Sequence, residues 1–283
     1  MNIQTLASKQ NPDGGWPYRK GSSWTEPTVY SMLAMLAAGA EDNAARGFQW
    51  LRRVSRADGG FAPQPGVEES SWVTALVALL PAERLGPAAH DRAIQWLLNT
   101  DSADTTPVFR LRAWLRGEAN IRDKVYSGWP WTRGAAAWVG PTAIAILALQ
   151  RANQRNPSSE LQRRIAEGRE YLLTHTCAGG GWNHGASQAL GVYQTAYPET
   201  TGMALTALRG VDAPEVHRGV GLAQQYLPAS RSADEINWLG LGLIAQSGMP
   251  AGYSRPAEVD VRTIPEMSLA ILLDEAQQGR EVL

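Results

Sequence analysis

Two kinds of hydrophobic pattern alternate along the chain. Segments that are apolar on nearly every side, such as residues 138–149 (WVGPTAIAILAL), are separated by more polar segments with an apolar stripe. Phe48, Leu51 and Val54 form one such stripe, in which successive members are three positions apart. A helix that is apolar all round must be buried, whereas an amphipathic helix covers a surface. The pattern therefore predicts buried helices inside a shell of amphipathic ones, and the scarcity of alternating β-branched runs argues against strands.

The apolar segments begin in the same way. Each starts with an acid or a glycine, and Thr, Ser or Asn follows two positions later. The starts are Glu26-Pro27-Thr28, Glu69-Ser70-Ser71, Gly140-Pro141-Thr142, Glu199-Thr200-Thr201, Glu235-Ile236-Asn237 and Glu266-Met267-Ser268. Glycine-rich turns that carry an aromatic residue precede four of them, at residues 11–18, 56–63, 126–134 and 177–185. The chain is therefore a set of repeated helical hairpins.

Repeated hairpins of this kind predict a closed double ring of helices. The fold class we expect is all-α, an (α/α)6 toroid that forms one domain over residues 1–283. Because every inner helix is reached by the same kind of hairpin, the amino ends of the inner helices should gather at one end of the ring. Residues 101–127 are expected to be an insertion in the third unit.

Composition narrows the functional classes. The net charge is −1, from 26 basic and 27 acidic residues, so no field of one sign exists to hold nucleic acid. The single cysteine, Cys177, excludes an intrachain disulfide. No apolar run approaches the roughly 18 residues that a membrane span needs, and the start lacks the pattern of a signal peptide. We expect a cytoplasmic protein that uses no cofactor and no metal.

The repeats resemble those of the terpenoid-cyclase and protein-prenyltransferase superfamily over most of the chain. Residues 5–16 (TLASKQNPDGGW) and 49–61 (QWLRRVSRADGGF) resemble the QW motif of squalene and hopene cyclases. Gln10 and Trp16 keep that motif, whereas Ser55 stands where its Gln would be. The resemblance implies an α/α toroid. It does not decide the function, because the same toroid hosts cyclases, transferases and non-catalytic domains.

The same resemblance points to candidate acids. Class II cyclases protonate an alkene with an Asp in a D-x-D-D-T run at the start of an inner helix, but no unit here reproduces the whole acid cluster. The Asp-x-Cys zinc ligands of prenyltransferases and the Cys-Gly-Glu-Gln run of thioester domains are also absent. The candidate acids are Glu69, the first choice, and then Glu26, Glu199 and Glu68.

Aromatic residues near the helix starts are candidates for the wall of a central cavity, because aromatic faces stabilise carbocations and hold isoprenoid chains. The expected substrate-binding residues are Trp24, Trp72, Trp138, Tyr197, Trp238 and Glu235. The alternative for the aromatic residues is packing between helices. The alternative for the recurrent Glu-x-Thr is helix-start chemistry, in which a carboxylate stabilises the helix by about 0.3–1 kcal/mol.

Two further clusters carry reactive side chains. His175, Cys177 and His184 are three potential metal ligands within ten residues, but no fourth ligand accompanies them. Basic residues in the insertion could bind a diphosphate, although no Asp-rich magnesium motif accompanies them. These residues are Arg110, Arg112, Arg116, Arg122 and Lys124. A structural role for the first cluster and a solvated face for the second are the favoured interpretations.

Two functional hypotheses follow. The leading one is a terpene cyclase-like or prenyltransferase-like protein that binds an isoprenoid or another hydrophobic small molecule in an aromatic central cavity. If it is catalytic, protonation by a Glu would cyclise that molecule. The alternative is a non-catalytic toroid that serves as a protein-interaction or ligand-carrier module. An open hole lined by aromatic side chains favours the first, and a hole plugged by side chains or by residues 101–127 favours the second.

Overall fold

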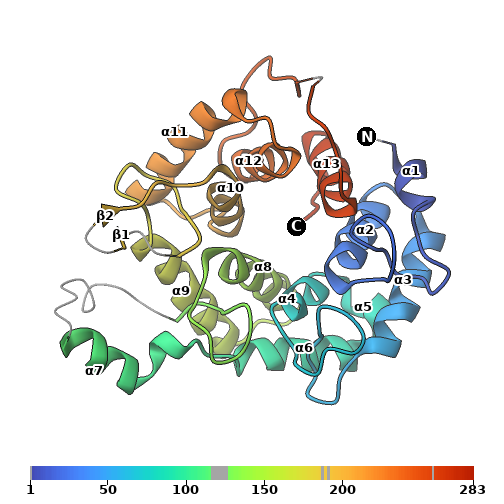
Figure 1. Cartoon of the computed structure of the whole chain (residues 1–283), viewed down its shortest axis with the longest axis horizontal. Helices are drawn as coiled ribbons and strands as arrows, with labels where there is room; N and C mark the ends of the chain where they lie inside the picture. Colours follow the sequence, from blue (N-terminus) through green and yellow to red (C-terminus); the bar gives the residue numbers. More distant parts are fainter. Residues whose placement is uncertain (1, 116–126, 186–187, 190–191, 257) are drawn as a thin grey trace.

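The helices form a ring. The computed structural model describes residues 2–115, 127–185, 188–189, 192–256 and 258–283. Within these ranges an inner ring consists of α2 (Thr25–Ala37), α4 (Val73–Ala78), α8 (Val139–Arg155), α10 (Pro198–Ala207), α12 (Ala233–Gln246) and α13 (Ile264–Gln277) (Figure 1). Each of these helices contacts the next, and α13 contacts α2, so the inner ring is closed. The (α/α)6 toroid expected from the sequence is confirmed.

Amphipathic helices cover the inner ring from outside. They are α1 (Ile3–Ala7), α3 (Glu41–Val54), α5 (Ala82–Leu85), α6 (Pro87–Leu98), α9 (Ser159–Thr174) and α11 (Pro214–Ala229). α3 packs on α2, α6 on α4, α9 on α8, and α11 on both α10 and α12. The predicted stripe of α3 faces inward, since Phe48 and Leu51 are buried while Arg52 and Arg53 are exposed.

Two excursions leave the ring on the side of α9. The insertion contains the short 3-10 helix η1 (Ala103–Thr105) and α7 (Pro107–Leu115), which projects outward (Figure 1). β1 (Gln188–Ala189) and β2 (Val192–Tyr193) form an antiparallel hairpin. The sequence argued against strands, and these two-residue strands are too short for an alternating pattern to show. Among the described helices, none is both long and apolar enough to cross a membrane.

One hydrogen bond recurs between the glycine-rich turns and the inner ring. The N–H of the turn aromatic donates to the Oγ1 of a threonine: Trp16 to Thr28 (2.8 Å), Phe61 to Thr74 (2.9 Å), Trp129 to Thr142 (2.8 Å) and Trp182 to Thr201 (3.1 Å). These bonds explain why Thr recurs at the helix starts. In the second unit the partner is Thr74, so the sequence alignment that put Ser71 there was wrong by three residues.

The turn tryptophans are structural. Trp16, Trp129 and Trp182 are all fully buried or nearly so, with at most 2% of their surface exposed. Their indole N–H groups donate to carbonyls at the ends of outer helices, for example Trp182 to Leu172 at 2.7 Å. A glycine two positions before Trp16 is needed for close approach. Gly14 has a φ of 93°, and a Cβ there would lie 2.6 Å from the carbonyl oxygen of Arg46.

Candidate active site

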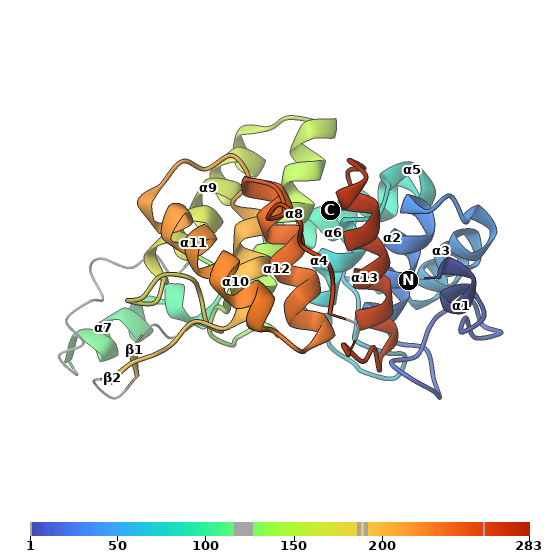
Figure 2. The same ribbon diagram turned by 90° about the horizontal axis from the view of Figure 1, so that it is seen from above.

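A pocket of about 370 Å³ lies at the amino ends of the inner ring, and we call it the central pocket. Residues from the first turns of α2, α8, α10, α12 and α13 line it, together with Trp72, which directly precedes Val73 of α4. Every member of the inner ring therefore presents its amino end to the same space. This confirms the parallel arrangement expected from the hairpins, and Figure 2 shows α10, α12 and α13 standing side by side.

Helical spacing gives the central pocket two layers. Its upper layer consists of carboxyl groups from first turns, those of Glu26, Glu199, Asp234 and Glu266. Side chains four positions apart on a helix lie on one face, one turn apart. The residues four positions after Glu26, Glu199 and Asp234 are Tyr30, Met203 and Trp238, and Leu269 joins them from α13. The carboxyl layer therefore stands above an apolar and aromatic floor.

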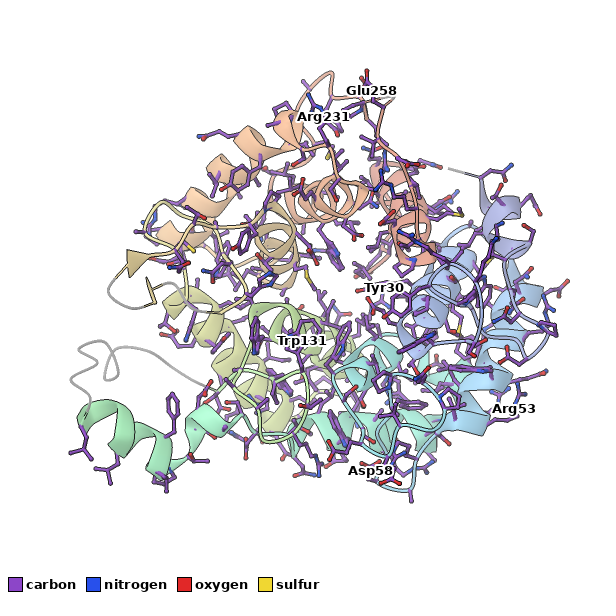
Figure 3. The ribbon with its side chains drawn as sticks, viewed as in Figure 1. Tyr30, Arg53, Asp58, Trp131, Arg231 and Glu258 are labelled. Carbon is purple, nitrogen blue, oxygen red and sulfur yellow. The ribbon has the colours of Figure 1, made fainter. Side chains whose placement is uncertain are left out.

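Aromatic side chains from the loops form the walls. The rings of Trp72 and Trp131 meet edge to face with centroids 4.8 Å apart. The backbone N–H of Trp72 donates to the carbonyl oxygen of Trp131 at 3.0 Å, which fixes the two loops against each other. Figure 3 shows Tyr30 and Trp131 near the centre of the ring, whereas Arg53 and Asp58 lie at its outer edge. The central pocket is thus bounded by rings on its floor and on its sides.

Three carboxyl groups of the central pocket, those of Glu26, Glu199 and Asp234, retain their protons to higher pH than they do in water. Burial raises the pKa of Asp234, and repulsion from Glu199, Glu266, Glu26 and Glu235 raises it further, to about 7. Burial is also the main cause of the raised pKa values of Glu26 and Glu199. No Lys or Arg is found among the described residues that line the central pocket. The described lining therefore supplies no Lys or Arg to offset the mutual repulsion of the carboxylates, although His184 acts against the rise in the pKa of Glu199.

Tyr18 orients Glu26 through a hydrogen bond. Its hydroxyl donates to Oε2 of Glu26, and burial followed by the charge of Glu26 raises the pKa of the phenol. Its carbonyl accepts a hydrogen bond of 2.8 Å from the N–H of Ile264, which ties this loop to the start of α13. The ring of Trp24 packs edge-on against Tyr18 at 5.4 Å. The loop that orients Glu26 therefore also closes the toroid.

An adjoining pocket of about 420 Å³ shares His184 with the central pocket. Trp138 and Tyr197 line it, and their ring centroids are 5.8 Å and 5.1 Å from that of His184. Both aromatic residues are more than a third exposed, at 37% and 47%. His184 therefore stands between the two pockets, flanked by aromatic rings.

The structure brings together some of the residues expected from the sequence. Glu26, Glu199, Trp72 and Trp238 line the central pocket. Trp138 and Tyr197 line the adjoining pocket, and Trp24 contacts Tyr18 but lines neither. Glu235 does not line the central pocket, although its charge raises the pKa of Asp234 and of Glu199.

Glu68 and Glu69 lie elsewhere. Both are exposed on the loop before α4, and neither lines the central pocket. The expectation that Glu69 stands at the rim of the cavity was wrong because the second unit was aligned on the wrong residue. Counting two residues back from Thr74 leads to Trp72, where the first and fourth units have Glu26 and Glu199. The second unit contributes an aromatic wall instead of an acid.

Sequence reasoning missed several residues of the central pocket. They are Tyr18, Tyr30, Trp131, Met203, Asp234 and Leu269. The four-residue spacing from an acid could have found Tyr30 and Met203. Asp234 was overlooked in favour of Glu235, since the fifth unit has no glycine-rich turn to fix its alignment. Tyr18 and Trp131 lie in loops, where helical spacing gives no guide.

Two members of the His/Cys cluster, His175 and His184, line the adjoining pocket. Nδ1 of His175 lies 2.8 Å from the carbonyl oxygen of Tyr171, and the two rings stack at 4.0 Å. Cys177 is buried. Within the ranges that the structure describes, no group of three or more His, Cys, Asp or Glu side chains is arranged to hold a metal ion. The side chains of Arg110 and Arg112, and residues Arg116, Arg122 and Lys124, lie outside the described part of the chain.

Comparison with known proteins supports the fold alone. No protein-family model and no curated protein matches the sequence. A GH8 endo-β-1,4-glucanase from an Achatina fulica gut metagenomic library matches in structure with 15% identity and a TM-score of 0.62, covering 98% of this chain and 97% of that one. The type II terpene cyclase MstE from Scytonema matches with 16% identity and a TM-score of 0.55, covering 96% and 77%. The endo-β-1,4-glucanase CMCax from Acetobacter xylinum matches with 13% identity and a TM-score of 0.56, covering 98% and 99%.

Proposed function

We propose that the central pocket binds a small hydrophobic molecule, with isoprenoids as the leading class, and that Asp234 is the acid that protonates it. The observation that carries the proposal is a carboxyl group with a pKa of about 7 in a layer of carboxylates above an apolar floor. A general acid works best when its pKa lies near the working pH. Asp234 meets this condition at neutral pH, whereas an ordinary Asp would be ionised.

The size and lining of the central pocket support a hydrophobic ligand. Its volume of about 370 Å³ falls in the range of small-molecule sites, roughly 300–1,000 Å³. Met203, Trp238 and Leu269 offer an apolar surface to a hydrocarbon chain. The terpene cyclase MstE, which shares the toroid, binds geranylgeranyl dihydroxybenzoate as its substrate. An isoprenoid is therefore the first class to test.

The proposed step is proton addition to a carbon–carbon double bond. The O–H proton of Asp234 is transferred to one alkene carbon, the π electrons form the new C–H bond, and a cation is left on the adjacent carbon. The carboxylates of Glu199 and Glu26 and the faces of Tyr30 and Trp238 stabilise that cation. A second double bond then attacks the cation to close a ring, and loss of a proton to a carboxylate ends the reaction.

Glycoside cleavage is a second candidate, and the acid itself favours it. A carboxyl group with a pKa near 7 is well matched to protonating a glycosidic oxygen, while a neighbouring carboxylate acts as base or nucleophile. Asp234 has such neighbours in Glu199 and Glu26. The transition state would again be cationic, so the same layer of carboxylates would serve either substrate class.

A non-catalytic carrier remains the third outcome to test. Such a protein would use the apolar floor and would not need the proton of Asp234. The presence of an open, aromatic-lined pocket favours a ligand in either case, and only turnover separates the carrier from the enzyme.

Proton transfer to carbon can be tested directly in D₂O. The full chain is incubated with geraniol, farnesol or geranylgeraniol, and the products are analysed by mass spectrometry. We expect a cyclic product with one deuterium on carbon, lost in Asp234→Asn and retained in the exposed control Glu69→Gln. Binding without conversion would identify a carrier. Release of reducing ends from cello-oligosaccharides would identify the second candidate, and neither binding nor conversion of any of these compounds would refute the proposal.

A further inference from the structure

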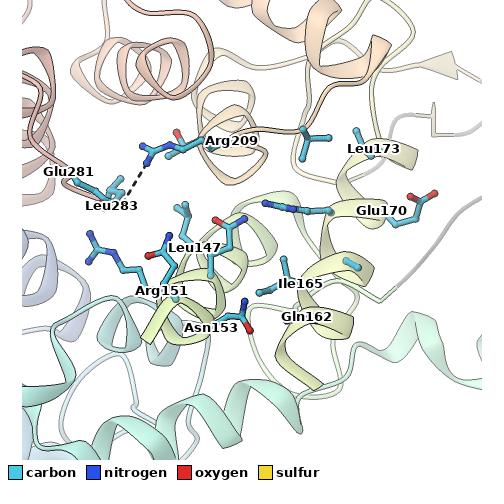
Figure 4. Close-up of a pocket in the computed structure, with 16 residues that line it drawn as sticks. Leu147, Arg151, Asn153, Gln162, Ile165, Glu170, Leu173, Arg209, Glu281 and Leu283 are labelled. Carbon is cyan, nitrogen blue, oxygen red and sulfur yellow. Dashed lines mark ion pairs between the residues drawn. The ribbon is translucent and has the colours of Figure 1, made fainter. Parts of the chain in front are cut away.

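The end of the toroid opposite the central pocket contains a cavity of about 610 Å³. It lies between the carboxyl-terminal half of α8, the side of α9 and the residues that follow α10 (Figure 4). Arg151, Arg169 and Arg209 line it, and the amides of Gln150, Gln154 and Gln162 add hydrogen-bonding groups. We call this space the arginine cavity. Nothing in the proposed chemistry of the central pocket uses it.

The three arginines differ in how they are partnered. Arg209 lies 3.7 Å from a carboxylate oxygen of Glu281, and Figure 4 marks this ion pair. Arg151 donates to the carbonyl oxygen of Leu79 at 2.6 Å. The Nε of Arg169 is buried and has no hydrogen-bond partner among the described residues. A buried guanidinium nitrogen without a partner is costly to the folded protein, so its presence calls for an explanation.

The helix dipole accounts for the positions of Arg151 and Arg209 but not for that of Arg169. Arginines near the carboxyl end of a helix interact favourably with its partial negative charge. Arg151 lies in the last turns of α8, and Arg209 follows α10 by two residues. Arg169 precedes the last turn of α9, which carries no basic residue, so the dipole of α9 does not account for it.

The acids near the cavity do not neutralise Arg169 either. Glu281 is engaged with Arg209. Glu170 lines the cavity too, but it follows Arg169 directly on α9, and adjacent residues on a helix point in different directions. Burial is the cause of the lowered pKa of Arg169. The partly buried guanidinium therefore has a buried Nε and no charge partner among the described residues.

We propose that the arginine cavity is a binding site for a small organic oxyanion, whose phosphate or carboxylate group pairs with Arg169. Planar guanidinium groups bind such oxyanions through two parallel hydrogen bonds. The amide of Gln154 would hold a polar group of the same ligand, whereas that of Gln150 already donates to the carbonyl oxygen of Ala207 at 3.1 Å. Leu147 and Ile165 offer an apolar wall to the body of the ligand. The volume suits a ligand of metabolite size.

Thermal unfolding and calorimetry on the full chain test this site without any assay of turnover. The probes are sodium pyrophosphate and sodium citrate at millimolar concentration, compared with sodium chloride at the same ionic strength. We expect one probe to raise the Tm and to bind with measurable heat. The probe that binds more tightly identifies the acidic group, phosphate for pyrophosphate and carboxylate for citrate.

Variants of α9 link the binding to the cavity. Arg169→Gln should weaken the affinity at least about tenfold, because it removes a charge-assisted, two-pronged contact. Arg163→Gln is the matched control, since Arg163 is exposed on the same helix and pairs with Glu167. Arg169→Lys keeps the charge without the planar fork and should give an intermediate affinity. If neither probe binds the native protein beyond the chloride control, or Arg169→Gln binds as tightly as the native protein, the proposal is wrong.

Discussion

The two pockets at opposite ends of the inner ring differ in their charged side chains although the same parallel helices form both: the central pocket has acids and no Lys or Arg among its described lining, and the arginine cavity has arginines as well as acids. Glu26, Glu199 and Asp234 stand at the amino ends, and Arg151 and Arg209 stand at the carboxyl ends. Helix dipoles favour this polarity, by about 0.3–1 kcal/mol for each charge at an exposed site. Part of the difference in charge between the two ends is therefore explained by helix dipoles, which favour acids at the amino ends and arginines at the carboxyl ends.

Helix dipoles do not explain the raised pKa of Asp234 or the position of Arg169. A helix amino end stabilises a carboxylate, which would lower the pKa of Asp234, yet burial and four neighbouring carboxylates raise it to about 7. At the other end, Arg169 is partly buried, and its Nε lies away from a helix terminus without a partner among the described residues. Groups held against their own electrostatic preference are concentrated at functional sites. The comparison therefore separates charges that serve the fold from charges that serve a ligand.

The largest expected effect is on catalysis at the amino end. Asp234→Asn removes the proton donor while keeping the shape of the side chain, so the rate of deuterium incorporation should fall by about 10²–10⁴-fold. The affinity for a non-reacting isoprenoid, measured by calorimetry, should change much less. A variant that turns over at the native rate would show that Asp234 is not the acid.

The next effect is on the pH dependence of stability. Between the ordinary pKa of 3.8 and about 7, the folded protein holds the Asp234 proton more firmly than the unfolded chain does. Stability should therefore fall as the pH rises through this window. Asp234→Asn should remove the part of that fall that Asp234 causes, while Glu26 and Glu199 keep their own contributions. The variant should be more stable than the native protein above pH 7, by about 2–4 kcal/mol.

Denaturant unfolding across this pH range, with native protein and variant in parallel, measures the difference. The two proteins should be equally stable below pH 3.8, where Asp234 is protonated in both states. Identical pH profiles for the two proteins at every pH would contradict the raised pKa.

A smaller effect should distinguish the hydroxyl groups of the second unit. Thr74→Val removes the acceptor for the N–H of Phe61 and should cost about 2 kcal/mol, because a buried donor is left unpaired. Ser71 is the control. Its buried hydroxyl has no partner among the described residues, so Ser71→Ala should be neutral or slightly stabilising. A larger loss from Ser71→Ala than from Thr74→Val, measured by urea unfolding, would restore the original alignment.

The smallest effect is expected from Glu69→Gln. The side chain is exposed and lies outside the central pocket. The free energy of unfolding should therefore stay within about 0.5 kcal/mol of the native value at every pH. A marked loss of turnover in this variant would show that the loop before α4 reaches the reacting ligand.

The ring could be predicted from the sequence because its signals are local. All-round apolar helices, amphipathic helices and glycine-rich turns each leave a pattern within about one helix length. Glu26 and Glu199 were found because the repeated helix starts share an acid two positions before a threonine. The spacing from the turn aromatic to its threonine is 12 residues in the first unit and 13 in the second and third, and this regularity would have identified Thr74.

The chemistry at each end was harder to predict because it depends on contacts distant in sequence. The pKa of Asp234 reflects Glu26 and Glu199, which other helices bring within reach. The arginine cavity combines residues of α8, α9 and the chain segment near residue 281. Trp131 joins the central pocket through a loop whose path no periodic pattern encodes. Local patterns therefore predicted the scaffold, and only the folded arrangement showed which side chains share a space.

The most direct test of the central claim is a ¹³C NMR titration of the side-chain carboxyl groups in protein labelled at aspartate, with Asp234→Asn to assign the signal. The account predicts one aspartate that titrates near pH 7 and disappears from the variant. If the signal that the variant removes instead titrates near the ordinary pKa of 3.8, Asp234 is ionised at neutral pH and the central pocket has no proton to donate.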